Sequence, residues 1–391
     1  MNSPRLVDLF LGFIRVGATA FGGPAMIPHV RKLVLKNRWF SEAEFRTGVA
    51  ICQMIPGATV MQLAAYVGMK TRGFLGAIAS FAGFGFPAFL MMIVLSSLYF
   101  HTREINWIIK LFSGLKVIVV AIVLHGAIDF AKRYTNHIWE QLIAFLAGVA
   151  FFFHLPPPVV LVFAAVVGIY LFRKDLRTSD CVVDNHSRVS KNIITRILGP
   201  IVATLICIAV VAFLMSLSPS LGSLATTMAK IDIVAFGGGF AALPIMLHTV
   251  VQKGWMNIET LLDGIALGQL TPGPIVITSV FIGFHKEGIW GAVIAAFGTF
   301  SPSFLILLWA TVLSDLWLYH WIAQAIFRAS LATLSGLMAA MAAMLIVKAS
   351  WDISGIILAT LAFLALQASV DIIWVILSGS VLWTLWNLFS K

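Results

Sequence analysis

Two positive charges lie at matching places in otherwise apolar stretches of this sequence. Arg15 precedes the phrase Phe21-Gly22-Gly23 by six residues, and Lys230 precedes Phe236-Gly237-Gly238 by the same interval. A charge inside such a stretch is costly, so it is a functional candidate by default. Two cations that converge would suit a small dianion. The alternatives are that both side chains reach out to a polar surface, or that Lys230 pairs with Asp232.

The two glycine phrases predict breaks in apolar helices. They consist of Phe21, Gly22, Gly23 and Pro24 in the first copy and of Phe236, Gly237, Gly238 and Gly239 in the second. Each glycine costs about 1 kcal/mol relative to alanine inside a helix, whereas Pro24 suits the first position of a new helix. The backbone of a broken helix lines a cavity or is buried in protein, and helix N-termini attract anions. Close helix packing through small residues is the alternative.

A second pair of phrases, QMIPGA at residues 53–58 and QLTPGP at residues 269–274, predicts two further breaks. Gln53 and Gln269 each precede the proline by three residues, so their amides can hydrogen-bond an oxyanion or cap the broken helix. The residues of the two turns are Pro56 and Gly57, and Pro272, Gly273 and Pro274. Hydroxyl and amide groups that follow the turns also suit an oxyanion, but they serve ordinary interhelical hydrogen bonds equally well; these are Thr59, Gln62, Thr278 and Ser279.

Titratable groups near such a path could carry protons. His125 and Asp129 share a helix face, because they are four residues apart. The other candidates are Glu44, Asp232, Asp263, His29 and His248. We find no nucleophile elbow, no phosphate-binding loop and no cluster with metal-ligand spacing. The sequence therefore predicts no enzymatic activity and no cofactor or metal. It predicts transport that is driven by a gradient or powered by a separate partner.

The elements that must position these residues are apolar helices. The chain of 391 residues is 60% hydrophobic and 11% charged, with a mean hydropathy of +0.99. A soluble globular chain carries about 25% charge. Several apolar runs reach the roughly 20 residues that a spanning helix needs. The sequence predicts an all-α polytopic membrane protein. Its net charge of +10 is concentrated in short loops, which indicates topology rather than a nucleic-acid partner.

The chain is also an internal duplication. Pairs of Gly, Pro, Trp and Gln recur 215 or 216 positions apart, from Phe21 and Phe236 through Gln53 and Gln269 to Pro87 and Pro302. We expect a first transporter repeat over 1–172, a polar cytoplasmic linker over 173–196, a connecting transmembrane helix over 197–217 and a second repeat over 218–391.

Basic loops predict how the repeats face. Residues 6–38 and 42–69 are expected to dip into the membrane and return, and four crossings follow near 74–100, 107–130, 138–154 and 158–172. Basic clusters then fall on the cytoplasmic side. The added helix over 197–217 carries the chain out of the cytoplasm, so the second repeat is expected to begin on the opposite side of the membrane from the first. The sequence thus predicts two inverted-topology repeats with broken or re-entrant helices, typical of secondary transporters.

These phrases together resemble the chromate ion transporter family in its long, two-domain form. The family pattern falls on Phe21 to Pro24, on Gln53, Pro56 and Gly57, on Phe236 to Gly239, and on Gln269 with Pro272 to Pro274. The resemblance implies export of chromate from the cytoplasm across the bacterial inner membrane, driven by the proton-motive force. Protons and the lipid bilayer would be its other partners, and a homodimer is one assembly that the sequence allows.

Two departures affect the substrate. Ala58 replaces the final proline of the first turn, and His29 does not match the family's alanine-histidine pair. Sulfate is isosteric with chromate, so a transporter of sulfate or a related oxyanion is one alternative. An uncoupled anion channel with the same architecture is another.

Overall fold

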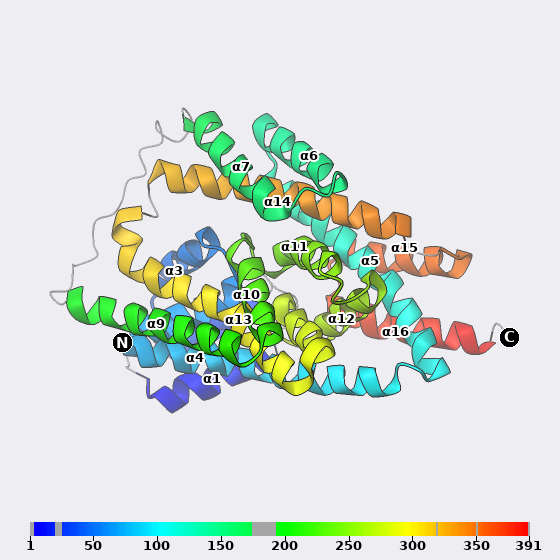
Figure 1. Ribbon diagram of the computed structural model, residues 1–391, viewed down its shortest axis with the longest axis horizontal. Coiled ribbons are helices and arrows are strands. Elements are labelled where there is room, and N and C mark those ends of the chain that lie inside the picture. The colour runs from blue at the N-terminus through cyan, green and yellow to red at the C-terminus, as the bar shows by residue number, and fades with distance from the viewer. Residues whose placement is uncertain (1–3, 20–25, 174–192, 318–319, 349–350, 390–391) are drawn as a thin grey trace.

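A computed structural model describes residues 4–19, 26–173, 193–317, 320–348 and 351–389 (Figure 1). Within these ranges every regular element is a helix. The first half contains α1 (Leu6–Thr19), α2 (Ile27–Lys36), α3 (Glu42–Met54), α4 (Thr59–Thr102), α5 (Asn106–Tyr134), α6 (Ile138–Phe152) and α7 (Pro157–Leu171). The second part contains α9 (Ile193–Leu217), α10 (Pro219–Ile233), α11 (Gly239–Gln252), α12 (Ile258–Leu270), η2 (Ile275–Ile277), α13 (Thr278–Trp317), α14 (Trp321–Lys348), α15 (Ile353–Gln367) and α16 (Ile372–Phe389).

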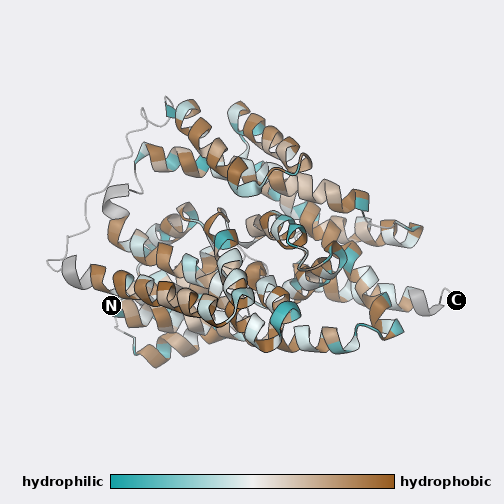
Figure 2. Ribbon diagram, in the orientation of Figure 1, coloured by the Kyte–Doolittle hydropathy of each residue, from teal (hydrophilic) through white to brown (hydrophobic). Residues whose placement is uncertain are grey.

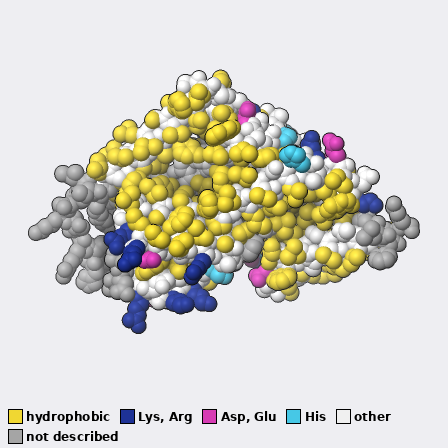
Figure 3. Space-filling view, turned by 90° about the horizontal axis from the view of Figure 1, so that it is seen from below, with side chains coloured by type: hydrophobic (Ala, Val, Ile, Leu, Met, Phe, Trp, Pro, Cys, Tyr) yellow, Lys and Arg dark blue, Asp and Glu magenta, His cyan; other side chains and the backbone are white. Residues whose placement is uncertain are grey.

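The surface of the helices is apolar, as a bilayer requires. In the part of the chain that the structure describes, five helical segments are long and apolar enough to cross a membrane, namely Thr59–Thr102, Asn106–Tyr134, Ile197–Leu217, Ile275–Leu313 and Trp321–Lys348. Apolar residues recur along nearly every helix (Figure 2). Hydrophobic side chains cover most of the face in Figure 3, while most Lys and Arg visible there gather at the end that holds the N-terminus. Exposed apolar surface of this extent marks a lipid-facing protein. The chain is a polytopic, multi-pass membrane protein.

Equivalent signals begin equivalent helices in the two halves. Ser41 caps α3 and Asn257 caps α12, each by accepting a hydrogen bond from the backbone three residues on. The corresponding residues His137 and Asp352 cap α6 and α15, where His137 accepts from the backbone N–H of Trp139 and Asp352 from that of Gly355. Such side chains satisfy N–H groups that the first helical turn leaves unpaired. The duplication in sequence is therefore also a duplication of helix starts.

The long helices α4 and α13 kink at matching points. Gly73 has a φ of 65° and Gly288 a φ of 59°, and both lie inside their helices. Glycine enters this left-handed region without the steric cost that a Cβ atom imposes. Each kink separates the segment that follows the Pro-Gly turn from the membrane crossing after it.

The halves are interlocked. Within each half the first helix packs on the long kinked one, α1 on α4 and α10 on α13. Between the halves, α6 and α7 pack on α14, whereas α15 and α16 pack on α5 (Figure 1). Each half therefore covers the other's central helix. Contacts between α4 and α13 and between α5 and α14 complete the core.

The predicted crossings match α4 after its kink, α5, α6 and α7, and the connecting helix is α9. Residues 174–192, most of the predicted linker, lie outside the described residues. The domain limits and the inverted orientation of the repeats stay predictions.

Candidate functional site

Three of the predicted helix breaks meet in the interior. The turn of residues 55–58 separates α3 from α4, residues 234–238 separate α10 from α11, and residues 271–274 separate α12 from η2. The N–H of Gly57 donates to the carbonyl of Ala235 at 2.9 Å, which joins the first Pro-Gly turn to the second glycine phrase. A Cβ atom at Gly238 would lie 3.5 Å from Oγ1 of Thr59, and one at Gly239 would lie 3.4 Å from the N of Ile275.

Positive φ angles allow these close approaches. Gly57 and Gly273 have φ angles of 112° and 110°, and Gly237 and Gly238 have angles of 83° and 98°. A Cβ atom at Gly237 would lie 2.7 Å from the ring of Phe130, so this position demands glycine for its space as well as for its angle. The predicted breaks in these three segments are confirmed.

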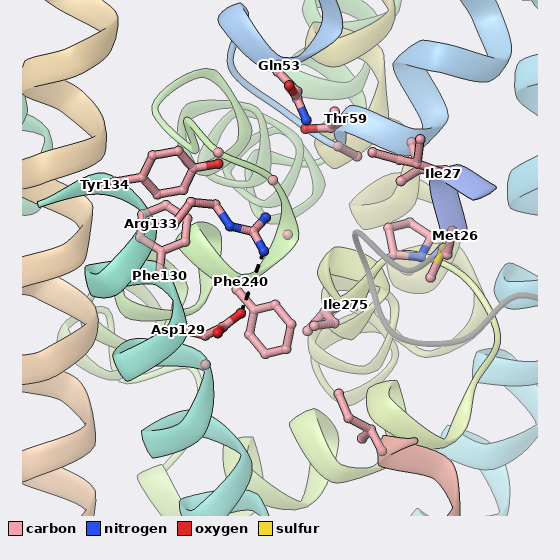
Figure 4. A pocket seen from close by; sticks show the side chains of 18 of the residues that line it. Met26, Ile27, Gln53, Thr59, Asp129, Phe130, Arg133, Tyr134, Phe240 and Ile275 are labelled. Carbon is pink, nitrogen blue, oxygen red and sulfur yellow. Dashed lines mark ion pairs between the residues drawn. The ribbon is translucent and has the colours of Figure 1, made fainter. Parts of the chain in front are cut away.

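A cavity of about 310 Å³ opens where the breaks meet (Figure 4). Its walls come from both halves. Polar side chains on it come from the end of α3, the start of α4 and one face of α5; these are Gln53, Thr59, His125, Asp129, Arg133 and Tyr134. Backbone of the second half completes it through Gly237, Gly238, Gly239 and Pro274. Apolar walls include Met26, Ile27, Phe130, Phe240 and Ile275.

The α5 face of the cavity carries its charge. His125, Asp129 and Arg133 follow one another at four-residue intervals, so they form a single stripe. Nη2 of Arg133 lies 3.7 Å from Oδ2 of Asp129, and both side chains are more than half exposed. Figure 4 shows Arg133 reaching into the middle of the cavity, with Gln53 and Thr59 on the facing wall. Nδ1 of His125 is buried and has no hydrogen-bond partner within the described residues.

Two helix N-termini also line the cavity. The α4 helix starts beside Ala58 and the α11 helix starts beside Gly238, and neither start has a side-chain cap. The first N–H groups of a helix have no partner within the helix, and the helix dipole makes that end positive. The arrangement combines two positive helix ends with one guanidinium, which is a set of donors for an oxyanion.

The structure places some of the residues predicted from the sequence on the cavity and others away from it. Gln53, Gly237, Gly238, Gly239 and Pro274 line the cavity. Pro56 and Gly57 belong to the turn beside it. Phe236, Pro272 and Gly273 lie in the breaks and Gln269 lies near the end of α12, and none of these four is on the cavity wall. Phe21, Gly22, Gly23 and Pro24 lie outside the described residues.

The two cations are placed differently from the cavity residues. Arg15 on α1 and Lys230 on α10 are both exposed and neither lines the cavity. Their joint role at a substrate site stays a prediction.

Arg133 is the residue that reasoning from sequence missed. Its neighbour Lys132 and its place near the end of an apolar run made it look like a loop cation. The helical interval from His125 through Asp129 was the available signal, because one more step of four residues reaches Arg133.

Comparison with known families matches the chain twice. A family profile described as "Chromate transporter" covers residues 7–169 and 222–384. The two matched regions correspond to the two repeats of the sequence. No solved structure matches the chain.

Individual relatives cover most of the chain. An uncharacterized transporter of Methanocaldococcus jannaschii is 35% identical over 90% of this chain and 87% of its own length. A probable chromate transport protein of Synechococcus elongatus is 30% identical over 75% of this chain and 72% of its own length. A chromate transport protein of Pseudomonas aeruginosa is 28% identical over 76% of this chain and 70% of its own length.

Proposed function

Because this chain belongs to the chromate transporter family, we propose that it exports chromate across the cytoplasmic membrane, driven by the proton-motive force. The observation that carries the proposal is the cavity, in which two uncapped helix N-termini and Arg133 face one space. Chromate is a tetrahedral dianion, so several N–H donors can bind its oxygens at once.

Each wall of the cavity has a part in this binding. The backbone N–H groups at the starts of α4 and α11 supply fixed donors, and Arg133 supplies charge. Gln53 and Thr59 orient the anion from the facing wall (Figure 4). The rings of Phe130 and Phe240 form an apolar part of the wall, which lowers the local polarity and strengthens each electrostatic contact beside it.

Asp129 sets how firmly the anion is held. Its carboxylate pairs with Arg133 at 3.7 Å, so an arriving dianion competes with it for the guanidinium. Release follows when the carboxylate recovers its partner. A transport site must release its substrate, and this internal competitor keeps the affinity moderate.

The membrane potential favours the proposed direction. Moving one charge through 100 mV is worth about 2.3 kcal/mol. A dianion that leaves a cell with a negative interior gains about twice that amount. Arg15 and Lys230, exposed on α1 and α10, are proposed to attract the dianion along its path rather than within the cavity.

Sulfate is the second candidate substrate. The donors on the cavity recognise a tetrahedral dianion without a feature specific to chromium, and the relative with 35% identity carries no substrate in its name. The protein would then transport sulfate as its main substrate and chromate only incidentally.

Uptake of radiolabelled chromate into everted membrane vesicles tests the proposal. We expect uptake when an imposed proton-motive force makes the vesicle interior positive, weak inhibition by excess sulfate, and marked loss in the double variant Arg15→Ala/Lys230→Ala. Uptake of sulfate but not chromate would replace the substrate. Chromate flux that follows the potential and ignores an imposed pH gradient would make the protein an uncoupled channel.

A further inference from the structure

A buried carboxyl group lies next to the cavity but not on its wall. Asp232, near the end of α10, is 0% exposed. The hydroxyl of Ser303 on α13 donates to its Oδ2 at 2.6 Å. The same hydroxyl oxygen accepts the N–H of Ala58 at 2.9 Å. Ala58 lines the cavity, so two successive hydrogen bonds connect the carboxyl group to the anion site.

Other polar groups enclose this connection. Gln62 is also 0% exposed, and its Nε2 donates to the carbonyl oxygens of Pro56 at 2.6 Å and of Ser303 at 3.3 Å. The first Pro-Gly turn is thereby held against α13 on the same side as Asp232. A change at the carboxyl group therefore reaches the backbone of the turn directly.

The carboxyl group has no paired cation among the side chains that the structure describes. Its Oδ1 has no hydrogen-bond partner within the described residues, and no ion pair is formed by Asp232 among them. A fully buried carboxylate without a cation costs much more free energy than the neutral acid does. Such a group inside a membrane protein marks an ion or proton path.

Among the side chains that the structure describes, no titratable group on the neighbouring elements forms an ion pair with Asp232. Lys230 is exposed and two residues away on the same helix, so it points to another side. The elements packed against α10 are α9, α11 and α13. Glu287 accepts a hydrogen bond from Ser220, near the opposite end of α10. The remaining titratable groups on these elements whose side chains the structure describes are Cys207, His248, whose ring lies near Phe151, His285, which stacks on Phe100, and Lys286, which lies over Trp255.

We propose that Asp232 is a proton-binding site and that its protonation raises the anion affinity of the cavity; this inference rests on the function proposed above. The ionised carboxylate can only accept, so it fixes the Ser303 hydroxyl as its donor and leaves that oxygen free to hold the Ala58 N–H. The neutral acid can donate to the Ser303 oxygen instead, and that oxygen then accepts from both the acid O–H and the Ala58 N–H. Sharing the oxygen weakens its hydrogen bond with the Ala58 N–H, which leaves this N–H more available to an anion in the cavity.

Charge acts in the same direction. An ionised Asp232 repels a dianion in the adjacent cavity, and protonation removes this repulsion. Proton binding and anion binding therefore favour each other, and thermodynamic linkage makes the effect reciprocal. Anion binding should draw a proton onto Asp232.

The other half of the chain supplies the variants for a test. Residue 303 corresponds to Ala88, whose Cβ atom occupies the matching position beside Gly273. Ser303→Ala therefore introduces a side chain that the first half already contains at the equivalent position. Asp263 provides a matched control, because it is also a buried acid on a short helix but accepts from Tyr99 and pairs with Lys116 instead of contacting the turn.

The experiment measures equilibrium binding of radiolabelled chromate to the full chain in nanodiscs between about pH 5 and pH 9. In Asp232→Asn the amide imitates the neutral acid. We expect the affinity of the wild type to equal that of the variant at acid pH and to fall about tenfold below it at alkaline pH. Chromate ionises identically in both samples, and His125, Asp129, Arg133 and Tyr134 on the cavity are unchanged, so the ratio of affinities isolates Asp232.

Two further measurements complete the test. Adding chromate to weakly buffered wild-type protein should take up protons, and Asp232→Asn should abolish this uptake. Ser303→Ala removes a donor from the carboxylate and should move the midpoint of the affinity change to higher pH. Asp263→Asn should keep the wild-type profile.

The outcomes separate the two proposals. A wild-type to Asp232→Asn ratio that is constant with pH overturns the proton site. If Asp232→Asn does not fold, an unmoved midpoint in Ser303→Ala overturns it. Wild-type protein that binds no chromate at any pH overturns the proposed function, and with it this inference.

Discussion

The two halves have the same backbone arrangement but different polar side chains. The helix caps Ser41 and Asn257 correspond, and so do the turn glycines Gly57 and Gly273, whose φ angles differ by only 2° (112° and 110°). Close backbone approaches also correspond. A Cβ atom at Gly68 would lie 2.1 Å from the carbonyl oxygen of Gly76, and one at Gly283 would lie 2.2 Å from that of Gly291. Backbone geometry has been kept in both copies.

The polar side chains differ between the same positions. The stripe of His125, Asp129 and Arg133 on α5 corresponds to Ala340, Met344 and Lys348 on α14. Asp232 corresponds to Gly17, and Ser303 corresponds to Ala88. Gln53 is exposed on the cavity, whereas Gln269 is buried with its Nε2 unpartnered within the described residues.

This difference separates two demands on the chain. Broken helices need glycine and proline in both halves, because the interlocked packing relies on each break. The anion needs one set of donors, so a single copy of the charged stripe is enough. Substitutions at paired positions should therefore affect stability in both halves and anion binding in one.

The largest contrast is expected between Arg133→Ala and Lys348→Ala. Arg133 reaches into the cavity, and its loss should weaken chromate binding about 100-fold, because hydrogen bonds to charged groups contribute about 1.5–3 kcal/mol each. Lys348 is exposed at the matching end of α14 and does not line the cavity, so its loss should change affinity less than about twofold. Isothermal titration with chromate measures both. Equal effects of the two variants would contradict a single charged copy, and Arg133→Lys should restore part of the binding.

Gly57→Ala and Gly273→Ala should differ in stability. Both force a side chain into a positive φ, which costs about 1–3 kcal/mol. At Gly57 the new Cβ atom would also lie 2.0 Å from Oγ of Ser303, whereas at Gly273 it would lie 2.8 Å from the Cβ atom of Ala88. We expect thermal unfolding in detergent to show a larger loss for Gly57→Ala. The double variant Gly57→Ala/Ser303→Ala should recover part of the loss; no recovery would mean that the crowding at Ser303 is unimportant.

The smallest contrast concerns the paired glutamines. Gln53→Ala should weaken chromate binding about tenfold without changing the unfolding temperature, because its amide faces the cavity. Gln269→Met should leave binding unchanged and keep or raise the unfolding temperature, since it removes a buried donor that has no partner among the described residues. Titration and thermal unfolding of the two purified variants check this. A loss of binding in Gln269→Met would show that the second glutamine also serves the anion.

The all-α membrane architecture could be predicted from residue types alone. Long apolar runs, few charges and paired helix-breaking phrases do not depend on how helices are arranged, because a bilayer acts on each segment separately. The cavity glycines Gly237 to Gly239 and the amide of Gln53 were identified for the same reason: a break in an apolar helix is visible locally.

The sequence by itself determined the duplication, the breaks and the membrane-spanning helices, because each of them depends on local composition and residue spacing. Only the tertiary structure decided which breaks share a cavity and which charges face it. Arg133 of the first half lines the same cavity as Gly238 of the second, and Asp232 is connected to Ala58 through Ser303. These contacts join residues far apart in the chain, and they follow from how α4 packs on α13 and how α5 lies over the start of α11. Local pattern carries no record of such packing, because it depends on the shapes of both partners.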